Sequence, residues 1–275
     1  MQRINFHINK CIYCGGEGET DEHIIPFALG GTAKLFKASC EKCRNITSKY
    51  ERNPLRNNWV EARAVLDYPS RKRDFGDEKF LLSVTFKNGE DGILELPKNK
   101  VLGLTPFLLY PLPAFFAPNN YNHGILVTGQ LVISFGMDIK ALTREYGLSA
   151  IRHDVFYKCN DTEIMIIRIA YCALIALLGV NSLDQCFVLP TIMGEKDDAG
   201  FWFGCDPEGK ITPLIGKQNS KNVIKLGVLQ KPGDKNRYIV VRLKFFASSD
   251  APEYIVIIGT LKPDYILQVH QSIIL

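Results

Sequence analysis

The stretch Cys11–Asn45, CIYCGGEGETDEHIIPFALGGTAKLFKASCEKCRN, decides how the N-terminal part of this chain folds. It opens with one Cys-x-x-Cys pair, Cys11 and Cys14, and closes with a second pair, Cys40 and Cys43. Each two-residue spacing aims two sulfurs at one point, and four thiolates are the donor set of a closed tetrahedral zinc site. The sequence therefore predicts a small module that folds around a structural Zn²⁺, because so small a unit lacks a sufficient core of its own.

Between the two cysteine pairs the pattern predicts a β-hairpin, and after them a helix. The segment Glu22–Phe27 has the composition of a strand, Gly30–Gly31 that of a turn, and Ala33–Ala38 that of a returning strand. From Glu41 to about Arg52 the residues favour a helix, with Ser39 as its N-cap. The expected order is cysteine pair, strand, turn, strand, cysteine pair, helix.

Composition narrows the class of protein. With 275 residues, 46% hydrophobic and 23% charged, the chain is globular and forms one or two domains. The net charge of +4 lies in residues 1–75, which hold 13 Lys and Arg against 9 Asp and Glu. This surplus favours a polyanionic partner, although a solvated surface of mixed charge explains it equally well.

The termini and apolar segments indicate no membrane partner. The first residues have no apolar core for a signal peptide, and the most apolar run, Ile164–Val180, contains Arg168 and is short for a membrane span. We therefore expect a cytoplasmic protein, in which paired cysteines bind metal rather than form disulfides. The other four cysteines are expected to be small buried side chains: Cys159, Cys172, Cys186 and Cys205.

We expect α+β architecture, with a zinc module over residues 1–75 and a larger accessory domain over residues 76–275. The second domain should have a mainly antiparallel sheet around one buried helix at Thr162–Leu178, which is apolar nearly all round. Pro54 should end the first helix, a second should cover Leu55–Leu66, and Leu102–Pro118 is too rich in proline for a regular element. The expected strands are Phe80–Phe86, Ile93–Leu96, Ile125–Phe135, Ile151–Tyr157, Phe201–Gly204, Asn222–Leu229, Tyr238–Phe246 and Tyr254–Leu261.

The segments Glu22–Pro26, Leu29–Gly31 and Lys37–Asn45, set around the two cysteine pairs, resemble the HNH endonuclease family. The resemblance is to its zinc-stapled branch and covers roughly residues 8–56. It implies a ββα-metal finger, similar to a treble clef, and metal-dependent hydrolysis of phosphodiester bonds. The implied substrate is DNA, with RNA not excluded, and the implied products carry 5′-phosphate and 3′-hydroxyl ends.

The same resemblance implies roles for individual residues. His23 would be the general base, and Glu22 with Asn45 would hold a catalytic Mg²⁺ or Mn²⁺. One departure from the family pattern is Arg44, which directly follows the second cysteine pair, where many members have His or Asn. Arg44 could instead clamp a phosphate, and Glu51 on the same helix is a further candidate ligand.

Basic side chains on and after the finger are expected to contact the nucleic-acid backbone, which they bind without reading its sequence. They are Lys34, Lys37, Lys42, Arg44, Lys49, Arg52, Arg71, Lys72 and Arg73. By analogy such a nuclease would suit genome defence, including antiviral defence, or a mobile element. Two alternatives stay open: a zinc finger that binds nucleic acid or protein without cutting, and a nuclease gated by a ligand or partner. In either case residues 76–275 could bind a protein partner or form a homo-oligomer.

Overall fold

The computed structural model describes residues 5–71, 75–118, 124–154, 157–158, 160–206, 214, 221–265 and 272–274. It is a mixed α+β structure with mostly antiparallel sheets and few helices, as predicted. Four cysteines cluster near the N-terminus, which is compatible with a zinc finger. In the described part of the chain, no helix is both long and apolar enough to cross a membrane.

The N-terminal part contains the predicted hairpin and helix, but the first strand of the hairpin covers Thr20–His23 and not Glu22–Phe27. Strands β2 (Thr20–His23) and β3 (Lys34–Ser39) pair antiparallel, β1 (Asn5–His7) pairs parallel with β3, and the short helix η1 (Phe27–Leu29) lies in the hairpin loop. Helix α1 (Glu41–Asn53) follows directly. Its N-cap is Cys40 and not Ser39, because the Cys40 sulfur accepts the backbone N–H of Cys43 at 3.5 Å.

Pro54 ends α1 as predicted, but the chain stays helical. A π-helical turn, η2 (Pro54–Asn58), leads into α2 (Val60–Val65), so the helix expected over Leu55–Leu66 is divided. Proline is tolerated in the first turn of a helical segment, where its missing N–H has no partner to lose. Trp59, at the junction, is 1% exposed and packs its ring 5.7–5.8 Å from those of Phe107, Phe245 and Phe246.

The largest sheet is mainly antiparallel and lies against the predicted buried helix. Its path is β10-β13-β12-β11-β14, with β9 also paired to β13. Helix α4 (Asp161–Leu178) packs against β11, β12 and β13, and almost all its side chains are buried, as predicted. The strands are β9 (Leu183–Cys186), β10 (Phe203–Cys205), β11 (Asn222–Leu229), β12 (Tyr238–Phe245), β13 (Glu253–Leu261) and β14 (Ser272–Ile274). Short helices α5 (Leu189–Ile192) and α6 (Ala199–Trp202) lie between β9 and β10.

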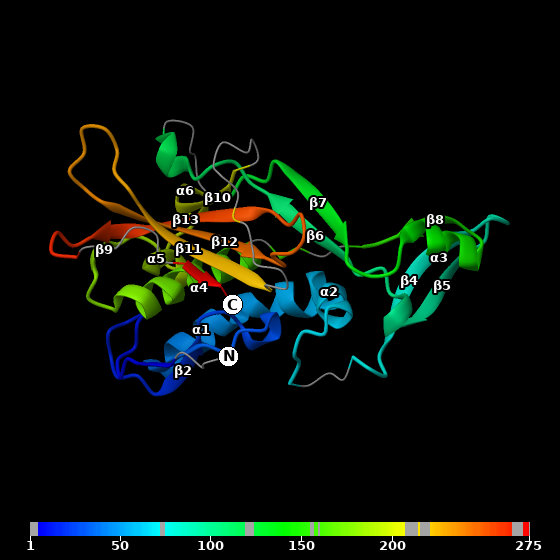
Figure 1. Cartoon of the computed structure of the whole chain (residues 1–275), viewed down its shortest axis with the longest axis horizontal. Helices are drawn as coiled ribbons and strands as arrows, with labels where there is room; N and C mark the ends of the chain where they lie inside the picture. Colours follow the sequence, from blue (N-terminus) through cyan, green and yellow to red (C-terminus); the bar gives the residue numbers. More distant parts are fainter. Residues whose placement is uncertain are drawn as a thin grey trace.

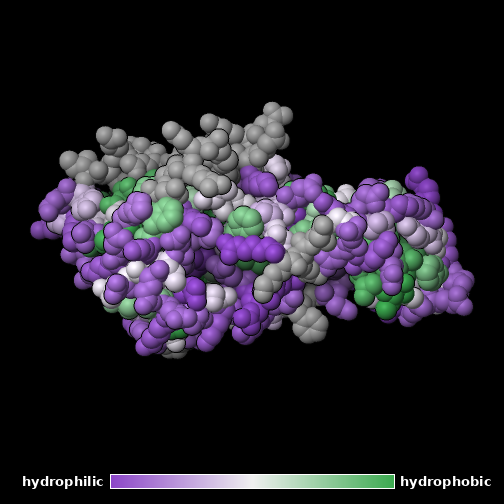
Figure 2. Space-filling view, turned by 90° about the horizontal axis from the view of Figure 1, so that it is seen from below, coloured by the Kyte–Doolittle hydropathy of each residue, from purple (hydrophilic) through white to green (hydrophobic). Residues whose placement is uncertain are grey.

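A small lobe projects from one end of the molecule (Figure 1). It contains the sheet β5-β4-β8 and has a separate core that includes Phe80, Val84 and Leu142. The lobe's elements are β4 (Lys79–Phe86), β5 (Asp91–Pro97), η3 (Lys98–Lys100), α3 (Ile139–Tyr146) and β8 (Leu148–Arg152). Seen from below, the larger part is covered mainly by hydrophilic side chains, whereas the lobe carries a hydrophobic area (Figure 2).

Several predicted boundaries are wrong. Leu102–Pro118 does contain a strand, β6 (Leu104–Leu109), which pairs with β7 (Gly129–Ser134), and a short helix η4 (Ala114–Phe116). Pro106 fits because its missing N–H lies on the side of β6 away from β7, the side on which the Leu104 N–H, two residues earlier, donates to Glu61. The strand predicted at Ile125–Phe135 is shorter, the one at Ile151–Tyr157 ends at Arg152, and α6 takes the first half of Phe201–Gly204.

The finger is packed tightly on the rest of the chain. One hydrophobic core runs from Cys11 and Ile12 through α4 to Leu261 on β13. The Tyr171 hydroxyl of α4 donates a hydrogen bond to the Ile12 carbonyl at 2.6 Å, and the Asn222 amide of β11 donates one to the Leu29 carbonyl at 2.8 Å. The division expected near residue 75 stays a prediction, and the shared core means that the finger is supported by α4 and the large sheet.

Candidate functional site

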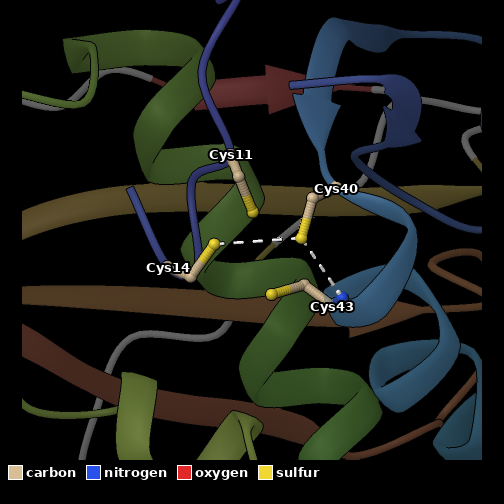
Figure 3. A group of neighbouring side chains, drawn as sticks. All are labelled: Cys11, Cys14, Cys40 and Cys43. Atoms are coloured by element: carbon tan, nitrogen blue, oxygen red, sulfur yellow. Dashed lines mark hydrogen bonds between the residues drawn. The ribbon is translucent and has the colours of Figure 1, made fainter. Parts of the chain in front are cut away.

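The four predicted cysteines converge in the structure (Figure 3). Cys11 and Cys14 come from the turn before β2, and Cys40 and Cys43 from the start of α1. All four sulfurs lie within 4.8 Å of one another, and the Cys14 and Cys40 sulfurs are 3.8 Å apart. Four sulfurs at about 2.3 Å from one zinc ion would stand about 3.8 Å apart at the corners of a tetrahedron. The group fits a structural metal such as zinc.

The backbone around the first cysteine pair suits a metal knuckle. Gly15 has φ +77°, a left-handed conformation that closes the turn after Cys14 and that glycine adopts without strain. Although burial acts in the opposite direction, backbone N–H groups of Cys40, Cys14 and Tyr13 lower the pKa of the Cys11 thiol below its ordinary value. At Cys43, burial followed by hydrogen bonds with the neighbouring cysteines raises the pKa of the thiol, so the cysteines of the group do not all shift in one direction.

A cavity of about 700 Å³ lies beside the finger, between the hairpin and one face of α1. The face of α1 that lines it carries Arg44, Thr47, Ser48, Glu51 and Arg52, at the three- and four-residue spacing of one helix side. The residues lining it from elsewhere include Asp21, Glu22, His23, Phe27, Arg56, Arg63, Arg71 and Arg168. Six arginines against three carboxylates give the cavity a positive lining.

The arginines of this cavity divide into two groups. Arg63 and Arg168 are buried and have structural partners; Arg63 donates to the carbonyls of Ala28, at 2.8 Å, and Pro69, at 3.2 Å. The other four are exposed at the cavity: Arg44, Arg52, Arg56 and Arg71. Guanidinium groups bind phosphate in a bidentate manner, so these four side chains have the chemistry to bind phosphate groups.

His23 is the titratable base of the cavity. It is partly buried at the end of β2, with its ring 6.3 Å from that of Phe27. Burial, followed by the positive charges of Lys34, Arg71 and Arg168, lowers the pKa of His23 to about 4. The imidazole is therefore neutral at pH 7, and it is a weaker proton acceptor than an unperturbed imidazole.

Glu22 is held in a buried ion-pair network. Its side chain is 7% exposed, and its Oε1 atom accepts hydrogen bonds from the Tyr13 hydroxyl, at 2.7 Å, and from the guanidinium of Arg168. The other terminal nitrogen of Arg168 donates to Glu51. The Arg168 side chain is 3% exposed. One arginine of α4 thus bridges two carboxylates of the finger, Glu22 of β2 and Glu51 of α1.

The structure does not bring Asn45 to Glu22 and His23. Asn45 is exposed and lies with Lys42 and Lys49 on a face of α1 that does not line the cavity, as their three- and seven-residue spacing requires. Lys37 is exposed on β3 and also lies outside the described lining, while Lys34 forms a 3.8 Å ion pair with Asp21. Of the predicted phosphate contacts, Arg44, Arg52 and Arg71 line the cavity, whereas Lys72 and Arg73 lie outside the described residues. Cys159, one of the cysteines predicted to be buried, also lies outside them.

The residues present do not fit the catalytic Mg²⁺ or Mn²⁺ that the HNH resemblance implies. The carboxylate expected to bind it, Glu22, already accepts from Arg168 and Tyr13, and Asn45 is on another face. Within the described ranges, the four zinc-type cysteines are the one group of three or more His, Cys, Asp or Glu side chains close enough to share an ion. The guanidinium of Arg168 supplies no replacement ligand at Glu22, because it has donors and no acceptor.

Sequence reasoning missed Arg168, Arg56 and Arg63 as parts of this site. Arg168 had a visible signal, because it is the one basic residue in the apolar stretch Ile164–Val180, and a charge inside such a helix needs a buried partner. The predicted burial of the scattered cysteines is confirmed for Cys172 and Cys205, and Cys186 is half-buried. Comparison with protein-family models, curated protein sequences and solved structures finds no match to this chain.

Proposed function

We propose that this protein hydrolyses phosphodiester bonds of nucleic acid, DNA in the first instance, in the arginine-lined cavity, with His23 as general base. The observation that carries the proposal is a neutral imidazole beside four exposed arginines in one cavity. The path of the chain supports it, because a hairpin that holds Glu22 and His23 is followed by a helix, the order that the resemblance to HNH endonucleases implies.

In this proposal the arginines hold the scissile phosphate and neutralise the charge that develops on its oxygens. Arg44, Arg52 and Arg71 are exposed, line the same cavity as His23 and supply this charge. His23 takes a proton from the attacking water, whose oxygen forms the new bond to phosphorus. The P–O3′ bond breaks, the leaving oxygen takes a proton from solvent, and His23 returns its proton to solvent. The products carry a 5′-phosphate and a 3′-hydroxyl.

The test compares cleavage of supercoiled plasmid and of end-labelled oligonucleotides by the full chain and by His23→Asn. A matched control is His7→Asn, on strand β1 of the same sheet and outside the cavity lining. Zinc content and far-UV circular dichroism establish that each variant is folded. Loss of cleavage in His23→Asn alone supports the proposal, whereas equal cleavage by His23→Asn and wild type refutes the assignment of the base.

A second function, nucleic-acid binding without cleavage, is favoured by one observation. The Glu22 carboxylate is buried and bonded to Arg168 and Tyr13, which leaves the cavity as an arginine site that holds phosphate. Fluorescence anisotropy with labelled DNA and RNA separates the two functions. If the wild-type protein binds DNA or RNA tightly but cuts neither under any condition that keeps it folded, the binding function replaces the nuclease proposal.

A further inference from the structure

The guanidinium of Arg168 stands between two carboxylates that come from different parts of the finger. One terminal nitrogen donates to Glu22 on β2 and the other to Glu51 on α1, while the Tyr13 hydroxyl donates a second hydrogen bond to the same oxygen of Glu22. Arg168 itself belongs to α4, 117 residues beyond Glu51 in the chain. Together with Asp21, Glu22 and Glu51 are the three carboxylates that line the cavity.

The guanidinium is well matched to this position. It is planar, permanently charged and offers parallel donors, so that it can satisfy two carboxylates at once in a dry environment. Although burial disfavours its charge, Glu51 and Glu22 hold the pKa of Arg168 above its ordinary value. A divalent cation at the same carboxylates would compete with these hydrogen bonds and place a second positive charge beside a buried guanidinium.

We infer that Arg168 is the resident cation of this cavity and takes the place of a divalent metal between Glu22 and Glu51. This inference rests on the proposed function and adds one property to it. Phosphate binding and hydrolysis at His23 proceed without Mg²⁺ or Mn²⁺. Arg168 acts as a positioning residue, since both its terminal nitrogens are engaged with the finger. The exposed arginines, and not a metal, meet the phosphate.

The direct test measures Mn²⁺ binding to the zinc-loaded full chain by electron paramagnetic resonance and calorimetry. Wild type should bind no Mn²⁺ at the carboxylates, so that Glu22→Gln leaves the titration unchanged. Arg168→Ala should gain one Mn²⁺ per chain, and the double variant Arg168→Ala with Glu22→Gln should lose it again. If Arg168→Ala does not fold, the wild-type titration and Glu22→Gln still decide the inference.

Two results would overturn the inference. One is a Mn²⁺ site in wild type that Glu22→Gln removes; the other is a folded Arg168→Ala variant that gains no such site. Cleavage by zinc-loaded wild type, with and without added Mg²⁺, is the second readout and should agree within about twofold, because no added metal takes part. A strict requirement for Mg²⁺ contradicts the inference, whereas no cleavage in any buffer refutes the nuclease proposal and leaves the Mn²⁺ titration to decide the role of Arg168.

Discussion

Replacing Arg168 with methionine should destabilise the protein strongly, and the cost can be worked from the buried network. The side chains of Arg168, Glu22 and Glu51 are 3%, 7% and 28% exposed. Removing one partner of a buried pair costs about 3–5 kcal/mol, because the remaining charge is left without compensation. We expect the lower end, about 3 kcal/mol, since Tyr13 still donates to Glu22 and methionine keeps much of the apolar stem.

Urea denaturation followed by circular dichroism measures this cost. With a urea dependence of about 3 kcal/mol per molar, the unfolding midpoint of Arg168→Met should fall by about 1 M. Arg56→Met is the matched control, because Arg56 is exposed at the same cavity and its substitution should move the midpoint little.

The direction of the stability change caused by Glu22→Gln tests whether Glu22 and Arg168 are coupled. Glu22→Gln should destabilise wild type, because Arg168 loses one of its two carboxylates, yet it should stabilise Arg168→Met by removing an unpaired buried charge. If Glu22→Gln shifts stability in the same direction in both backgrounds, Glu22 and Arg168 are not coupled as described. A midpoint change below about 0.3 M in Arg168→Met would equally refute the reasoning.

Three further predictions concern the metal, the histidine and the arginines. Cys43→Ser should release zinc and lose amide-exchange protection in the finger, because a structural zinc contributes folding energy. The control Cys205→Ser, at a buried cysteine outside the group, should keep its zinc. A Cys43→Ser protein with full zinc content would refute the site. The unfolded chain binds a proton at His23 near pH 6.5 and the folded chain near pH 4, so stability should fall by up to about 3 kcal/mol as the pH drops through that window. The unfolding free energy of His23→Asn, measured by urea titration, should depend less on pH over the same range. An equal dependence on pH in His23→Asn and wild type would contradict the lowered pKa. For nucleic-acid binding, Arg52→Gln should reduce the slope of log affinity against log salt by about 0.7–0.9, as loss of one phosphate contact does, and an unchanged slope places Arg52 outside the binding surface.

The zinc group and the elements around it could be predicted because their signals are local. Two-residue cysteine spacing decides where sulfurs meet whatever the rest of the chain does, and α1 begins at the second pair as its residues favour. The buried helix Asp161–Leu178 and strands such as Asn222–Leu229 were equally predictable, since long apolar periodicity signals burial directly. Leu102–Pro118 was mispredicted because one-sided pairing of β6 depends on a partner more than twenty residues away.

Within the cavity, residue type determined the chemistry and only the tertiary structure determined the partners. The sequence alone showed that Glu22 and His23 adjoin on one strand, that Arg44, Asn45 and Glu51 share one helix, and that the N-terminal part is basic. It contained no information on which carboxylate would be available, because Arg168 reaches Glu22 from 146 residues away through the packing of α4 on the finger. A buried carboxylate takes the nearest cation that the fold supplies, and that cation is decided by packing, not by spacing along the chain.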